Sequence, residues 1–75
     1  MNLPDLVRLY AAAKPGWRWS QIQHDGVVDC HLYAPEVEGS HAPARDRIGL
    51  SYWGRGGGVE DAFADALGKI LGRKL

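Results

Sequence analysis

The fold is decided by one stretch, WRWSQIQHDGVVDCHLYA, which spans residues 17–34. Two runs rich in aromatic and β-branched residues flank the dipeptide Asp25-Gly26. A two-residue Asp-Gly link favours a type I′ hairpin turn, because this turn needs positive φ angles at both central residues. The sequence therefore predicts strands over 17–24 and 27–34, in a register that pairs His24 with Val27.

This register divides the hairpin side chains between two faces, because successive side chains of a strand point to opposite sides. It also pairs Gln21 with Cys30 and Trp19 with Leu32. The expected core face carries Trp17, Trp19, Val28, Cys30 and Leu32. Gln21 and Gln23 fall on the same side, and we expect them at its open end. The other face carries Arg18, Ser20, Ile22, Val27, Asp29, His31 and Tyr33.

A helix is predicted on each side of the strands, over about 3–14 and about 59–73. Asn2 is a suitable N-cap for the first helix, and Pro15-Gly16 ends it. Its apolar residues at helical spacing are Leu3, Leu6, Val7, Tyr10, Ala11 and Ala13. The second helix has an apolar stripe formed by Val59, Phe63, Ala66, Leu67, Ile70 and Leu71. Glu60 and Asp61 in its first turn complement the helix dipole.

A third strand is predicted over 47–53, and the glycine-rich run 54–58 is interpreted as a mobile joint. The faces of this strand would carry Ile48, Leu50 and Tyr52 on one side and Gly49, Ser51 and Trp53 on the other. Residues 35–46 are expected to form a loop, either ordered and functional or disordered. The sequence thus predicts one α+β domain over 1–75, ordered α-β-β-β-α. Both helices would cover one face of a three-stranded antiparallel meander.

Composition argues against several classes of protein. Nine basic residues balance nine acidic ones, whereas a nucleic-acid-binding domain usually has a basic excess. The only cysteine, Cys30, cannot form an internal disulfide, and we expect it to be a small buried hydrophobic residue. Residues 1–5 lack the basic start and apolar run of a secretion signal. We therefore expect a soluble cytoplasmic protein without a membrane span.

No motif indicates catalysis, a cofactor or a metal. The glycine run lacks the spacing of phosphate-binding loops, and Cys30 and His31 point to opposite faces of their strand. The carboxylates of Asp25, Asp29, Glu36 and Glu38 have no partner recognisable from spacing. A chain this short is also expected to have little room for a pocket of ~300 Å³ or more. We expect a protein that is not an enzyme and that holds no cofactor or metal ion.

The open face of the sheet is the candidate binding surface. Aromatic residues and arginine are the types that anchor protein interfaces. The candidate partner-binding residues are Trp53, Tyr33, His31, Arg18 and Arg55, with Glu36 and Glu38 in the loop. Three occupancies stay open: a host protein or ribonucleoprotein complex, a homodimer through this face or through an outer strand edge, and simple exposure. A nucleic-acid-binding module that stacks bases on the sheet aromatics is the alternative function.

The predicted topology and the segment 54–67, GRGGGVEDAFADAL, resemble the double-stranded RNA-binding domain. That family has lysines at the start of its last helix, which contact phosphates. Alignment on Ala62 puts Val59 and Glu60 at those positions. The resemblance therefore implies the fold without RNA binding.

The chain also resembles, in length, charge balance and its final helix EDAFADAL (residues 60–67), small accessory proteins of phages and prophages, including some anti-CRISPR proteins. This second resemblance implies a non-catalytic inhibitor that masks a surface of a host complex, such as a CRISPR surveillance complex.

Overall fold

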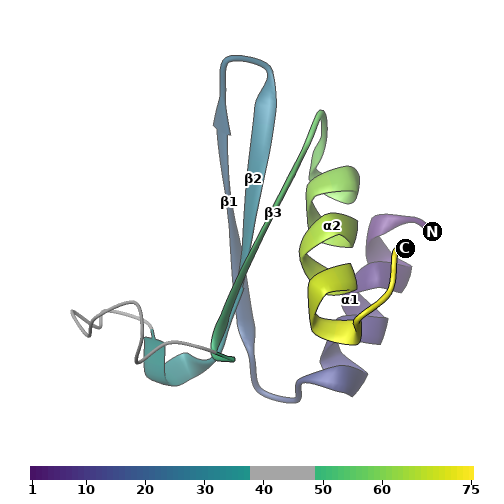
Figure 1. Cartoon of the computed structure of the whole chain (residues 1–75), viewed down its shortest axis with the longest axis vertical. Helices are drawn as coiled ribbons and strands as arrows, with labels where there is room; N and C mark the ends of the chain where they lie inside the picture. The colour runs from purple at the N-terminus through teal and green to yellow at the C-terminus, as the bar shows by residue number, and fades with distance from the viewer. Residues whose placement is uncertain (38–48) are drawn as a thin grey trace.

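The computed structural model of the chain describes residues 1–37 and 49–75. Its elements, in chain order, are α1 (Leu3–Ala13), β1 (Arg18–His24), β2 (Val27–Tyr33), the 3₁₀ helix η1 (Pro35–Val37), β3 (Ser51–Gly56) and α2 (Val59–Leu71). The strands form one antiparallel sheet in the order β1-β2-β3. Both helices lie on the same side of this sheet (Figure 1). The predicted α-β-β-β-α order and α+β class are therefore confirmed.

The hairpin between β1 and β2 has the predicted turn and register. Asp25 and Gly26 have φ angles of 50° and 75°, as a type I′ turn requires. His24 pairs with Val27, and the predicted Gln21–Cys30 and Trp19–Leu32 pairs are present. On the helix side of β2, Val28, Cys30 and Leu32 are buried, while Gln21 and Gln23 of β1 are exposed. Burial raises the pKa of the Cys30 thiol to about 11, which agrees with its predicted place in the core.

Phe63 of α2 contacts both α1 and the sheet. Its ring makes edge-to-face contacts with Tyr10 of α1, at 5.6 Å between centroids, and with Trp19 of β1, at 5.0 Å. The Tyr10 hydroxyl donates a hydrogen bond of 2.8 Å to the backbone carbonyl of Arg18, and burial raises the pKa of Tyr10 to about 12. The core thus includes α1, α2 and the covered side of the sheet.

The apolar stripe predicted for α1 is only partly right. Leu6 and Tyr10 are buried, and the predicted cap is present, because the Asn2 side chain accepts a 3.0 Å hydrogen bond from the Asp5 amide. Ala11 and Ala13 are exposed, whereas Leu9 packs against the core. A methyl group buries little apolar area, so the larger leucine determines which side of the helix faces inward.

The third strand differs from the prediction, because it runs over Ser51–Gly56 and not over 47–53. Gly49, at φ +81°, lies in a turn, a conformation that does not continue a strand, and residues 47 and 48 lie outside the described residues. The predicted faces hold for Tyr52, whose ring lies 6.2 Å from that of Trp17, and for Trp53, which is exposed on the open side.

The interpretation of the glycine run as a mobile joint was wrong for its first half. Gly54 and Gly56 belong to β3, and α2 packs directly on this strand. A Cβ atom on Gly54 would lie 2.2 Å from the Ala62 carbonyl oxygen and 2.3 Å from the Ala66 nitrogen. Glycine is therefore required there for close packing of helix on strand, and only Gly57 and Gly58 connect the two elements.

The first part of the predicted loop over 35–46 is ordered. It forms η1, in which Val37 is buried, and the Ala34 amide donates a 2.9 Å hydrogen bond to the Leu50 carbonyl. The rest of this loop, including Glu38, lies outside the described residues. In the part of the chain that is described, neither helix is long and apolar enough to cross a membrane.

Candidate functional site

The strand register brings most of the predicted binding residues together on the open face. Across the three strands, Tyr33 lies between Arg18 and Ser51, His31 between Ser20 and Trp53, and Asp29 between Ile22 and Arg55. Five of the seven predicted residues therefore share this face: Arg18, His31, Tyr33, Trp53 and Arg55. Of the other two, Glu36 is exposed in η1, and Glu38 lies outside the described residues.

Three of these residues form a stacked group, which we call the aromatic cluster: Tyr33, His31 and Trp53. The rings of His31 and Trp53 are 4.2 Å apart and almost parallel, at 4°. Those of His31 and Tyr33 are 4.5 Å apart at 29°. His31 Nε2 also lies 2.5 Å from Ser51 Oγ. The imidazole contacts side chains of both β2 and β3, and 47% of the surface of Trp53 remains exposed beside it.

A polar cluster formed by Asp29, Arg55 and His24 lies on the same face. Arg55 donates from Nε to Asp29 Oδ1 at 2.7 Å and from Nη2 to Oδ2 at 3.3 Å. His24 Nε2 lies 2.8 Å from the same Oδ2 atom. Hydrogen bonds from Arg55, and then from His24, lower the pKa of Asp29 to about 2. The charge of Arg55 is thus balanced by a carboxylate within the chain.

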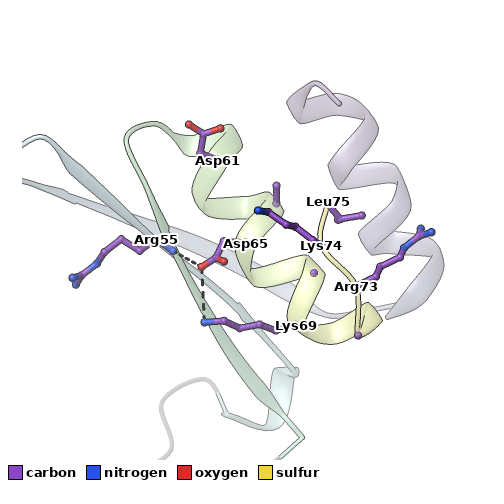
Figure 2. A pocket seen from close by; sticks show the side chains of 10 residues that line it. Arg55, Asp61, Asp65, Lys69, Arg73, Lys74 and Leu75 are labelled. Carbon is purple, nitrogen blue, oxygen red and sulfur yellow. Dashed lines mark hydrogen bonds and ion pairs between the residues drawn. The ribbon is translucent and has the colours of Figure 1, made fainter.

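The outer edge of β3 is covered by side chains of α2. The Arg55 amide donates a 3.1 Å hydrogen bond to Asp65 Oδ2, and Lys69 Nζ donates a 2.6 Å bond to the Trp53 carbonyl. Lys69 Nζ also lies 3.9 Å from Asp65 Oδ2, an ion pair that Figure 2 marks with a dashed line. These contacts occupy backbone groups that point away from β2 and fix the strand that carries Trp53.

A surface groove of about 690 Å³ lies between β3, α2 and residues 72–75. This volume exceeds ~300 Å³, so the expectation that the chain has little room for a pocket of that size was wrong. Figure 2 shows acidic and basic side chains on its walls, with Arg73 directed away from β3. The charged residues of the wall are Arg55, Asp61, Asp65, Lys69, Arg73 and Lys74. Four of these residues are basic and two are acidic.

Two groupings of the described side chains bear on catalysis and on metal binding. His31 and Ser51 have the proximity of a base and a nucleophile, but a reactive serine also needs N–H donors for an oxyanion. Ser51 is the first residue of β3 and directly follows the turn at residues 49–50. Within residues 1–37 and 49–75, no three His, Cys, Asp or Glu side chains gather as possible metal ligands.

Sequence reasoning missed the polar cluster and the covered edge of β3. Asp29 had no recognisable partner because the third strand was ended at Trp53. Extension of that strand to Gly56 in the same register puts Arg55 directly opposite Asp29. No pattern in the sequence indicated the contacts of Asp65 and Lys69 with β3, since these contacts depend on how α2 packs against the sheet.

Comparisons with protein-family models, with curated proteins and with solved structures found no significant match to this chain. The function is therefore inferred from the geometry of the open face.

Proposed function

We propose that this chain is a non-enzymatic binding protein whose open sheet face covers a surface of another macromolecule. The observation that supports this proposal best is the aromatic cluster. His31 stacks with both Tyr33 and Trp53, so three rings are held in place before a partner arrives. Ordered aromatic side chains lose little conformational entropy on binding, and they are frequent anchors of protein interfaces.

The charges on this face favour a protein partner over nucleic acid. Arg55 is paired with Asp29, and the first turn of α2 carries Glu60 and Asp61. Binding to nucleic acid relies on cationic side chains that replace the counterions of phosphate groups. An arginine already bound to a carboxylate contributes little to that exchange.

The stacking geometry also disfavours a platform for bases. A base-stacking platform offers the flat face of an aromatic ring to each base. One face of the Trp53 indole is already covered by the almost parallel imidazole of His31. A protein surface can instead contact both the edge of the cluster and the exposed aliphatic side chain of Ile22, which lies on the same face.

Within this class, we favour a phage-encoded inhibitor that acts in the cytoplasm by masking a host complex, such as a CRISPR surveillance complex. The support for this narrower proposal is the resemblance in size, charge balance and final helix together with the binding face. Masking requires no catalytic group. It requires a stable surface that is complementary to a site used by the host complex.

Trp53→Ala and Glu60→Ala form a matched pair for the test. Trp53 lies in the aromatic cluster, whereas Glu60 is exposed on α2, away from the open face. The tagged wild-type chain and the Glu60→Ala variant should retain the same partner complex from a bacterial lysate. Trp53→Ala should weaken that interaction about 30-fold, as expected for an anchor contributing ~2 kcal/mol.

Titration of a purified surveillance complex tests the narrower proposal. The wild-type chain should prevent the complex from binding its target DNA, and Trp53→Ala should require much higher concentrations. Equal inhibition by wild type and Trp53→Ala would exclude the open face as the binding surface. A gel shift with single- and double-stranded probes at low salt, lost as salt rises, would instead support the nucleic-acid alternative.

A further inference from the structure

The two outer edges of the sheet differ in whether side chains cover their outward-pointing backbone groups. In a type I′ hairpin, the pair next to the turn, here His24 and Val27, is a hydrogen-bonded pair. Hydrogen-bonded pairs then alternate along the ladder, so the backbone groups of Gln21 and Gln23 point away from β2. The equivalent groups of β3 are covered by Asp65 and Lys69.

Among the described residues, the second half of β1 is exposed on both faces of the sheet and contacts another strand only along its β2 edge. All five residues of 20–24 are exposed, and Ile22 at their centre has 53% of its surface exposed. Proteins commonly protect an edge strand with lysine, proline or a bulge. Residues 19–23 contain neither lysine nor proline, and their pairing with β2 is continuous. This edge can therefore accept another strand.

We propose that a second copy of this chain pairs with β1, antiparallel, about a two-fold axis at Ile22. The segment Gln21-Ile22-Gln23 reads the same in both directions. The axis therefore puts Ile22 opposite Ile22 of the second copy and each Gln21 opposite a Gln23. The two glutamine pairs exchange backbone hydrogen bonds, and the isoleucines occupy the closer type of pair, with Cα atoms about 4.5 Å apart.

The isoleucine pair favours this register, because Arg18 of each copy lies one position from Asp25 of the other whether the axis is at Ile22 or at Gln21. A shift of the axis to Gln21 would put Arg18 opposite His24 and Ile22 opposite Ser20. That register loses the apolar pair.

The dimer would be a continuous six-stranded sheet. Because paired residues of antiparallel strands point to the same face, both aromatic clusters would lie on one side and all helices on the other. Two strand edges alone bury less than the ~1,200 Å² of a standard interface, so the association depends on concentration. The paired edge shares Ile22 with the proposed binding face, but its test uses the purified chain alone and requires no other partner.

Cysteine cross-linking tests the pairing and its register together. Ile22→Cys should form a disulfide-linked dimer under mild oxidation, since the Cα separation at the axis suits a disulfide. Ser20→Cys is the matched control. Ser20 is exposed, as Ile22 is, but in the dimer it would lie about 13 Å along the strands from Ser20 of the second copy. Cys30 is buried and does not compete. Equal cross-linking of the two variants would overturn the proposal.

Light scattering over a concentration series provides the second measurement. The mass of the wild-type chain should rise from 8.2 kDa towards twice that value. Gln21→Pro removes an outward N–H group and should stay monomeric, whereas Gln21→Ala keeps that group and should dimerise like wild type. If circular dichroism shows that the proline variant does not fold, Ile22→Lys replaces it, since it opposes two cations at the axis. A wild-type mass that stays at 8.2 kDa to millimolar concentration would also overturn the proposal.

Discussion

The two faces of this sheet are formed by the same three strands but differ in their side chains and in how those side chains are held. On the covered face, small and apolar residues are closely packed: Leu32 and Cys30 are fully buried, and Gly54 lies against the backbone of α2. On the open face, large polar and aromatic side chains are held by stacking and by ion pairs. Because side chains alternate along a strand, one set can stabilise the fold while the other is available for binding.

A methyl group added to the covered face should destabilise the protein most. Gly54→Ala would put a Cβ atom 2.2 Å from the Ala62 carbonyl oxygen, and α2 would have to move away from β3. We expect a loss of about 3 kcal/mol or more in the free energy of unfolding, a large part of the stability of a domain this small. Gly57→Ala is the matched control, because its Cβ atom would have no atom within 4 Å. Chemical denaturation should show Gly57→Ala close to wild type, and two stable variants would contradict the close packing.

Truncation of one large side chain on each face compares how much the two faces contribute to stability. Leu32→Ala leaves a cavity between β2 and the helices and should cost about 3 kcal/mol. Trp53→Ala removes a half-exposed ring and its stacking with His31, and should cost about 1 kcal/mol. Urea denaturation measures both. A larger loss for Trp53→Ala than for Leu32→Ala would mean that the open face, and not the covered one, dominates stability.

The smallest effect is a change in titration on the open face. Arg55→Gln removes the main cause of the low pKa of Asp29, so this pKa should rise from about 2 towards the usual value of 3.8. A carboxylate with a lowered pKa stabilises the fold above pH 3.8, and that contribution is lost as the pH falls through its folded pKa. In Arg55→Gln little of that contribution should remain, so acid should destabilise the variant less than wild type below pH 4. NMR titration of the Asp29 carboxyl measures the shift. Arg8→Gln, which removes an ion pair on α1, should leave Asp29 unchanged.

The sequence was sufficient for much of the fold because the decisive signals are local. The Asp25-Gly26 turn requires positive φ angles, and this requirement sets the pairing of β1 with β2 and the face on which each residue of the hairpin lies. The cap at Asn2 and the apolar stripe of α2 likewise depend on neighbours within a few residues. These features follow from backbone conformation and side-chain period, which the order of residues determines directly.

Tertiary packing decided what lies beyond those local signals. The extent of β3, and with it the Asp29–Arg55 pair, depends on α2, which comes close enough to require glycine at Gly54. The cover of one sheet edge depends on Asp65 and Lys69, which meet β3 only when that helix is in place. The sequence determined which residues face outward, because alternation along a strand is a local property. Packing between elements distant in the chain decided which of them meet and which edge stays open.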